Sequence, residues 1–214
     1  MSLRLASYLY CFFSIGYTTF LHPDPSIFTA LMKPLPILLL ALATMRWAAR
    51  DWRGPIALGL GFSASGDLLL ALDDLRGGLF TVGLGSFLVA QGLYAWAFWR
   101  HRHPDATRRR LALAYLPVSL LLAVMVLPAA GTLAVPVAAY LLGVTAMVTG
   151  AALTDRSLLV FAGALCFAAS DTLIGVNKFL VAVPAAGTLI MASYYLAQGL
   201  ICAGVIRSPS TAPA

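Results

Sequence analysis

Residues 55–72, PIALGLGFSASGDLLLAL, form an apolar run of 18 residues whose only charged side chain is Asp67. The length matches the roughly 20 residues that an α-helix needs to cross the hydrocarbon core of a bilayer. Gly59, Ser63 and Asp67 follow one another at steps of four residues, so they fall on one face of such a helix. The stretch therefore predicts a transmembrane helix with a small and polar stripe that includes a carboxyl group.

Comparable apolar runs fill the rest of the chain. The 214 residues are 61% hydrophobic and 10% charged, whereas soluble domains average about 25% charged residues. This composition excludes a water-soluble enzyme, a secreted disulfide scaffold and a disordered chain. The first run looks like a signal peptide, but no small-residue cleavage site follows it, so we interpret it as a helix. We predict an all-α polytopic membrane bundle of eight transmembrane helices, at about 3–21, 28–48, 55–72, 79–99, 111–128, 133–153, 158–176 and 185–206.

Lys and Arg residues fall unevenly on the two sides of this arrangement. One side collects eleven of them, and the other has only Lys33, Arg76 and Lys178. Because Lys and Arg accumulate on the cytoplasmic side, both termini are predicted in the cytoplasm and the protein in the cell (inner) membrane. The net charge of +6 is explained by this topology rather than by nucleic-acid binding. The eleven are Arg4, Arg46, Arg50, Arg53, Arg100, Arg102, Arg108, Arg109, Arg110, Arg156 and Arg207.

The two halves of the chain carry a faint internal repeat. Ala-Gln-Gly-Leu occurs at residues 90–93 and again at 197–200. Asp67 precedes the first Gln by 24 residues, and Asp171 precedes the second by 27. An even number of helices per unit makes the two halves run in the same direction. We predict a single transmembrane domain, 1–207, with pseudo-repeats at about 1–103 and 108–207, followed by a flexible tail, 208–214.

Asp67 and Asp171 differ from the other six acidic residues, all Asp, which lie at predicted helix ends or in loops. Both lie well inside apolar helices that start on the cytoplasmic side, so they should reach a similar depth. A carboxylate at the centre of a transmembrane helix costs about 2.5–3.5 kcal/mol. One explanation is that each Asp hydrogen-bonds a neighbouring helix and holds the bundle together. The explanation that we favour is a catalytic pair that faces one shared hollow inside the membrane.

Polar side chains on neighbouring helices are candidates for binding a substrate in this hollow. A buried Gln needs hydrogen-bond partners, so Gln91 and Gln198 are expected to bind a ligand or to orient an Asp. The Tyr residues are also explained by packing. Lys33 and Lys178 either snorkel to the interface or contact a phosphate headgroup or an Asp. The candidate substrate-binding residues are Lys33, Ser63, Gln91, Tyr94, Tyr140, Ser170, Lys178, Tyr194, Tyr195 and Gln198.

The sequence lacks the residue patterns of several other kinds of active site. His22, His101 and His103 lie at predicted helix ends and no His lies inside a predicted span, so no metal site is expected. The three Cys residues lie far apart within apolar runs, and we interpret them as packing residues. The sequence has no Gly-x-Ser-x-Gly nucleophile motif. Intramembrane aspartyl proteases often carry Gly-x-Gly-Asp, whereas residues 64–67 are Ala-Ser-Gly-Asp.

Four short motifs are specific as a set: KPLP at 33–36, SGD at 65–67, GALCF at 163–167 leading to Ser170-Asp171, and YYLAQ at 194–198. With them the chain resembles the YhhN-type lysoplasmalogenases over nearly its whole length. The resemblance implies a multi-pass hydrolase, without a metal cofactor, that cleaves the vinyl-ether bond of lysoplasmalogens. The implied products are a fatty aldehyde and glycerophosphoethanolamine or glycerophosphocholine. Relatives often have His where this chain has Gln91, which implies a difference in rate, pH optimum or substrate.

Acid-catalysed hydrolysis of a vinyl ether fits the residues that the sequence offers. Protonation of the β-carbon gives an oxocarbenium ion, which water converts to a hemiacetal that collapses to aldehyde and alcohol. One neutral carboxylic acid and one carboxylate are needed, and Asp67 and Asp171 supply them in either order. Two alternatives stay open: a proton-coupled transporter or lipid-binding protein that uses the same Asp pair, and a hydrolase of another lysolipid. The expected partners are a lysophospholipid substrate and membrane lipids, with the oligomeric state left open.

Overall fold

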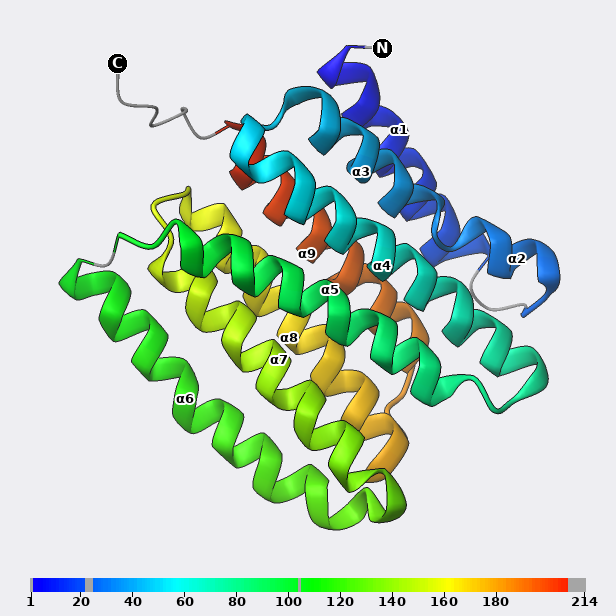
Figure 1. The fold of residues 1–214 in the computed structure, drawn as a ribbon. Coiled ribbons are helices and arrows are strands. Elements are labelled where there is room, and N and C mark those ends of the chain that lie inside the picture. The colour runs from blue at the N-terminus through cyan, green and yellow to red at the C-terminus, as the bar shows by residue number, and fades with distance from the viewer. Residues whose placement is uncertain (1, 22–24, 104, 208–214) are drawn as a thin grey trace, which may run out of the picture.

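The computed structural model describes residues 2–21, 25–103 and 105–207, and the predicted tail 208–214 lies outside them. Within the described residues the chain is helical, and its only β-type pairing is an isolated bridge between Arg102 and Thr154. The predicted all-α bundle is therefore confirmed (Figure 1). The elements are α1 (Leu3–Gly16), the π-helix η1 (Tyr17–Leu21), α2 (Ile27–Met32), α3 (Leu35–Trp47), α4 (Arg50–Arg76), α5 (Phe80–Arg100), α6 (Ala106–Val126), the 3-10 helices η2 (Leu127–Ala129) and η3 (Gly131–Leu133), α7 (Ala134–Leu153), α8 (Leu158–Phe179) and α9 (Ala186–Arg207).

Every predicted transmembrane segment recurs as helix, with one interruption. In the described part of the chain, seven segments are long and apolar enough to cross a membrane, and α2 with α3 forms the first. The chain turns between α2 and α3 because Pro34 and Pro36 lack the N–H groups that would continue the helix. The remaining predicted segment is α1, which is 14 residues long and continues through η1 to Leu21. The chain is a multi-pass membrane protein.

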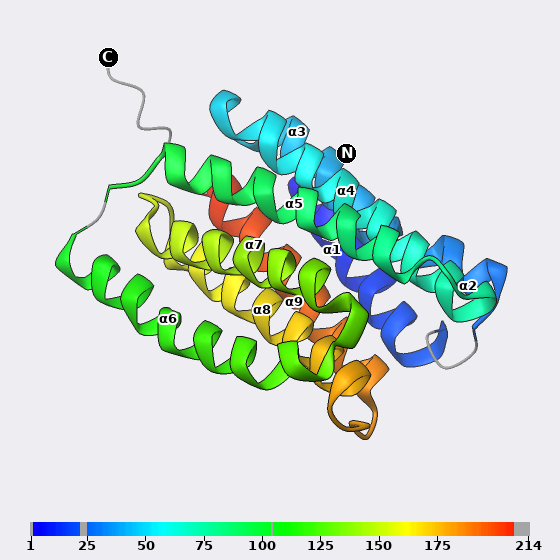
Figure 2. The ribbon, with the colours of Figure 1, turned by 60° about the horizontal axis from the view of Figure 1, so that its bottom comes forward.

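The two ends of the bundle differ in charge. The α3–α4, α5–α6 and α7–α8 connections lie at one end, together with the start of α1 and the end of α9 (Figures 1 and 2). Arg50 begins α4, Arg100 ends α5 and Arg207 ends α9, so we call this the Arg-rich end. The α2–α3 junction and the α4–α5 and α8–α9 connections lie at the opposite end.

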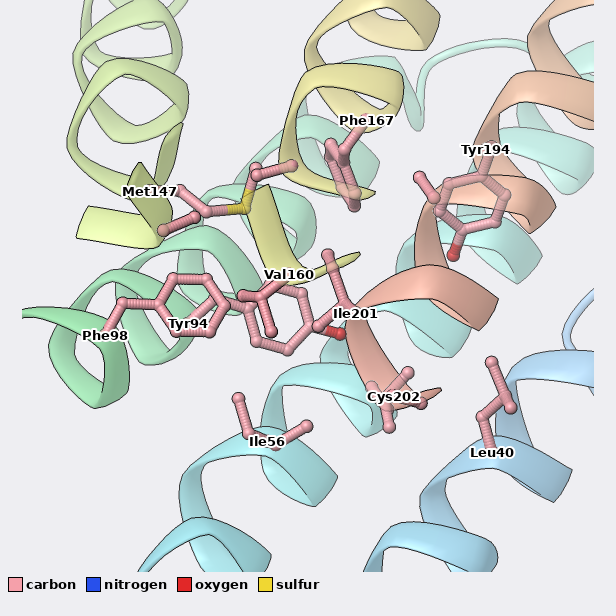
Figure 3. Close-up of a cluster of buried hydrophobic side chains, with 14 of the residues drawn as sticks. Leu40, Ile56, Tyr94, Phe98, Met147, Val160, Phe167, Tyr194, Ile201 and Cys202 are labelled. Carbon is pink, nitrogen blue, oxygen red and sulfur yellow. The ribbon is translucent and has the colours of Figure 1, made fainter. Parts of the chain in front are cut away.

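Two helical hairpins form the centre of the bundle. α4 packs along α5, and α8 packs along α9, in the two most extensive helix pairs. Gly163 allows the close approach within the second pair, because a Cβ there would lie 2.8 Å from the carbonyl oxygen of Ala197. Side chains from several helices fill the core, where the labelled and fully buried residues include Tyr94, Met147, Phe167 and Ile201 (Figure 3).

Helix α6 lies at the edge of the bundle in both ribbon views (Figures 1 and 2). Large apolar side chains along it, such as Leu113, Leu120 and Val124, are more than half exposed. Exposed side chains of this kind suit contact with lipid tails. Its other face packs on α7 and brings Tyr115 into the interior.

Candidate active site

A narrow apolar cavity lies inside the bundle between α4, α5, α6, α7 and α8, and we call it the inner cavity. Its volume is about 60 Å³. Four lining residues carry polar side-chain groups, namely Tyr115, Tyr140, Asp171 and Thr172, and the others are apolar or Gly. Asp171 is the one charged side chain among the described residues that line it. Because a carboxyl group is costly in such surroundings, Asp171 is a candidate functional group.

Asp171 is held in position from α5. Gln91 is fully buried, and its Nε2 donates a hydrogen bond to Asp171 Oδ2 at 3.1 Å. Gly143 of α7 leaves room for this amide, because a Cβ there would lie 2.8 Å from Gln91 Oε1. This oxygen has no hydrogen-bond partner among the described residues. The Tyr140 hydroxyl lies beside the same carboxyl, so two polar groups border Asp171 at the cavity wall.

Asp67 lies in a different setting. Its side chain is only 2% exposed, and its Oδ2 accepts a hydrogen bond from the Tyr194 hydroxyl at 2.8 Å. The preceding Gly66 lets the Phe87 ring pack against α4, since a Cβ at this position would lie 2.6 Å from the ring. Lys33 is near enough to act on the carboxyl electrostatically, although no ion pair joins the two among the described residues.

Three aromatic rings connect Asp67 to the wall of the inner cavity, and we call Phe87, Phe167 and Tyr194 the aromatic trio. The ring centroids are 6.3 Å apart for Phe87 and Phe167, 5.7 Å for Phe87 and Tyr194, and 5.8 Å for Phe167 and Tyr194, all edge to face. Phe87 belongs to the cavity wall, whereas Asp67 is not among the residues that line it. The structure thus differs from the expectation that both carboxyls face one hollow, because bulky rings fill the space beside Asp67.

A buried chain of hydrogen bonds lies one helical turn from Asp67. The Tyr94 hydroxyl donates to Gln198 Oε1 at 2.9 Å, and Gln198 Nε2 donates to Ser63 Oγ at 3.1 Å. Tyr94, Gln198 and Ser63 are all fully buried. The two repeated Gln residues therefore act across the halves of the chain: Gln91 of the first half contacts α8, and Gln198 of the second half contacts α4.

The other predicted residues lie away from the inner cavity. The Ser170 hydroxyl donates to a backbone carbonyl of α9 at 3.0 Å, and the Tyr195 hydroxyl donates to the carbonyl of Lys33 at 2.8 Å. Both bonds tie α9 to a neighbouring segment. The ammonium of Lys178, at the end of α8, lies 4.0 Å from the centroid of the Phe80 ring. Neither lysine lines the inner cavity.

Both lysines line a second cavity, which we call the end cavity, at the end of the bundle opposite the Arg-rich end. Its volume is about 340 Å³. Leu70, Phe80 and Ile174 line both cavities, so the two adjoin. No group of three or more His, Cys, Asp or Glu side chains that could hold a metal ion occurs in the described ranges. The charged and amide side chains of the end cavity are Lys33, Asp73, Asp74, Asn177 and Lys178.

Reasoning from the sequence missed several residues of these cavities, and three of them are instructive. Tyr115 and Phe87 line the inner cavity, and Asp74 lines the end cavity. Tyr115 gave a signal that could have been used. It is the only Tyr of its own apolar segment, and that segment has few other polar groups. Asp74 gave none, since an acidic residue at a helix end is usually explained by solvation alone.

Comparisons with known proteins converge on one family. The model of the YhhN family matches residues 28–205. A protein of Mycobacterium tuberculosis named lysoplasmalogenase is 34% identical over 82% of this chain and 69% of its own length, and that of Mycobacterium bovis matches equally. The human protein named lysoplasmalogenase TMEM86A is 34% identical over 86% of this chain and 81% of its own length. No solved structure matches the chain.

Proposed function

The chain belongs to the YhhN family, and on that premise we propose that it is a membrane-embedded hydrolase that cleaves the vinyl-ether bond of lysoplasmalogens. The products are a fatty aldehyde and glycerophosphoethanolamine or glycerophosphocholine. Relatives that are named lysoplasmalogenases support this activity. In this chain the proposal depends most on Asp171, a carboxyl group that lines an apolar cavity among membrane-spanning helices.

The proposed reaction begins with proton transfer to carbon. Asp171 donates its proton to the β-carbon of the vinyl ether, so the double bond is lost and an oxocarbenium ion forms beside the new carboxylate. Water adds to the cation, and the proton that it releases restores a protonated carboxyl. The hemiacetal then breaks into the aldehyde and the glycerol hydroxyl. One water molecule is consumed, and no oxidant or reductant is required.

Gln91 is the positioning residue in this scheme. Its Nε2 holds Asp171 Oδ2 at 3.1 Å, which leaves the other carboxyl oxygen for the proton that is transferred. Tyr140 lies beside the same group and lines the cavity, so we assign it contact with the substrate near the ether oxygen. The family resemblance implies His at this position in many relatives, and the neutral amide of Gln91 cannot take up or release a proton as imidazole does.

Asp67 is the second carboxyl of the proposed mechanism, in which its anion stabilises the oxocarbenium ion and activates the water. The aromatic trio now lies against it, so this role requires Phe87 and Tyr194 to move when the substrate enters. The small volume of the inner cavity, about 60 Å³, leads to the same requirement. A lipid chain therefore enters only as the cavity widens.

We place the alkenyl chain of the substrate in the inner cavity, with its headgroup toward Lys33 and Lys178 in the end cavity. We place the Arg-rich end, and with it both termini, in the cytoplasm, because arginines accumulate on the cytoplasmic side of a membrane protein. In this orientation the end cavity lies at the outer leaflet of the cell (inner) membrane. The substrate thus approaches from the outer leaflet.

The test is aldehyde release in deuterium oxide. Purified protein in detergent is incubated with an alkenyl lysophosphoethanolamine, and the aldehyde is trapped and analysed by mass spectrometry. Protonation at carbon predicts one deuterium on the carbon next to the carbonyl, and activity that a chelator does not change. The saturated alkyl-ether analogue should give no aldehyde. Bound lysolipid without any product would support the transporter or lipid-binding alternative, and fatty acid released from an acyl lysolipid would identify another lysolipid hydrolase.

A further inference from the structure

The end cavity carries charges of both signs next to an apolar cavity. Lys33 comes from the α2–α3 junction, Asp73 and Asp74 from the end of α4, and Lys178 from the end of α8. Elements far apart in the sequence therefore bring two ammonium and two carboxylate groups around about 340 Å³ of space. Within the described residues no ion pair joins any of the four groups to another. None of the four charges is therefore neutralised by another of them.

Lys33 provides the strongest sign of a ligand. Its side chain is only 8% exposed, and in the described part of the chain its ammonium has neither a hydrogen-bond nor an ion-pair partner. The end cavity gives this ammonium room for an anionic group, which would pair with a charge that the described residues leave unpaired. The backbone carbonyl of Lys33 is fixed by the Tyr195 hydroxyl, so the residue is held where it lines the cavity.

The carboxylates of the end cavity divide into one that holds a turn and one that does not. Asp73 Oδ1 accepts a hydrogen bond from the backbone N–H of Leu79 at 2.7 Å and so fixes the α4–α5 connection. Asn177 fixes the α8–α9 connection in the same way through its Oδ1. Asp74 is exposed, and its carboxylate has no hydrogen bond among the described residues. Asp74 is therefore the carboxylate that remains for a cationic group.

We propose that the end cavity is a headgroup site for a zwitterionic lysophospholipid, in which Lys33 and Lys178 bind the phosphodiester and Asp74 binds the ammonium. The adjoining apolar cavity receives the single chain, since Leu70, Phe80 and Ile174 line both spaces. This assignment rests on the proposed function for the identity of the chain. The new element is selectivity between two lipids that share the phosphodiester. The lipid whose headgroup also has an ammonium should bind more tightly than the lipid whose headgroup lacks one.

Binding of saturated ether lipids tests the assignment without any need for hydrolysis. The probes are alkyl-ether lysophosphoethanolamine and alkyl-ether lysophosphoglycerol, which share the chain and the phosphodiester and differ in the ammonium. Affinities for the full-length protein are measured in detergent by microscale thermophoresis. We expect the wild type to bind the ethanolamine lipid more tightly than the glycerol lipid. In Asp74→Asn the ratio of the two affinities should fall by about tenfold. Lys178→Gln should weaken both lipids alike.

Two matched variants control for general effects of charge. Asp51→Asn removes an exposed carboxylate at the Arg-rich end, and Arg76→Gln removes an exposed cation near the end cavity that does not line it. Both should leave the preference and the affinities unchanged. Equal binding of the two lipids by the wild type, or an Asp74→Asn variant that keeps the preference, would overturn the headgroup assignment. Since neither probe has a vinyl ether, a failed hydrolysis assay would leave this result unaffected.

Discussion

Asp67 and Asp171 lie at corresponding positions of the two predicted pseudo-repeats, yet their surroundings differ. Asp171 lines the inner cavity and is held by Gln91. Asp67 is almost fully buried against Tyr194, and aromatic rings fill the space next to it. We interpret the sequence match as a duplicated position, and its two predicted copies lie in different surroundings in the structure. We propose that the carboxyl of the second half transfers the proton, while that of the first half takes part only when the rings move.

The two α-helical hairpins support the proposed duplication itself. α4 with α5 and α8 with α9 are the most extensive helix pairs, and each second helix carries the repeated Gln. Each Gln side chain reaches the Asp-bearing helix of the other half. A repeat that stabilised only its own half would not cross in this way. We propose that the site around Asp171 needs both halves, because Gln91 of the first half binds its carboxyl group.

The largest effect is expected from Asp171→Asn. Because the amide cannot donate the proton in the reaction, we expect aldehyde release to fall by about a thousandfold. Asn keeps the size of Asp and can still accept from Gln91, so the unfolding temperature should stay near that of the wild type. Initial rates per folded protein and thermal unfolding in the same detergent measure both quantities. The control is Asp51→Asn, which removes a carboxylate at the Arg-rich end. Full activity of Asp171→Asn would show that Asp171 does not take part in the mechanism.

Asp67→Asn separates a catalytic from a structural role of the first carboxyl. The two-Asp mechanism predicts a loss of about a hundredfold in rate. The Asn side chain still offers an oxygen to Tyr194, so the loss in stability should be about 1 kcal/mol. A variant with normal kcat and a lower folded yield would show instead that Asp67 holds helices together. That outcome would leave the assignment of Asp171 unchanged.

Gln91→Leu tests how firmly the carboxyl of the inner cavity must be held. Without the amide, Asp171 can rotate away from the vinyl group, so we expect kcat to fall by about tenfold while KM changes little. Gln91→His introduces an imidazole, the group that the family resemblance implies at this position, and should retain more activity than Gln91→Leu with a changed pH profile. Rates across a pH series compare the three proteins. Equal profiles for the wild type and both variants would contradict a positioning role.

Most of the fold could be predicted from the sequence because the membrane imposes a simple rule on helix length and composition. Each predicted segment recurs as helix within a few residues. The break between α2 and α3 was not predicted, although Pro34 and Pro36 carried the signal for it. The last part of the first predicted span is the π-helix η1, which follows α1. No residue pattern predicted this change of hydrogen bonding.

The candidate site was less predictable because helix periodicity does not fix which side chains fill the space between helices. The sequence places Asp67 and Asp171 at similar depth, but it does not reveal that Phe87 packs on Gly66 and closes the space beside Asp67. Likewise Ser170 follows the pattern of a site residue, yet it bonds a backbone carbonyl of α9. These outcomes depend on packing between distant segments, which one sequence does not encode locally.

The smallest effect is expected from two adjacent tyrosines, of which one binds Asp67 and the other does not. The hydroxyls of Tyr194 and Tyr195 are both buried and each donates one hydrogen bond of 2.8 Å, the first to Asp67 and the second to the carbonyl of Lys33. Tyr194→Phe and Tyr195→Phe should therefore lose similar stability, about 1 kcal/mol each, in thermal unfolding. Only Tyr194→Phe should also change the rate of aldehyde release, severalfold, because it alone removes the hydrogen bond to the carboxyl of Asp67. If the two variants lost activity equally, the loss would reflect packing of α9, and the hydrogen bond from Tyr194 to Asp67 would have no part in the reaction.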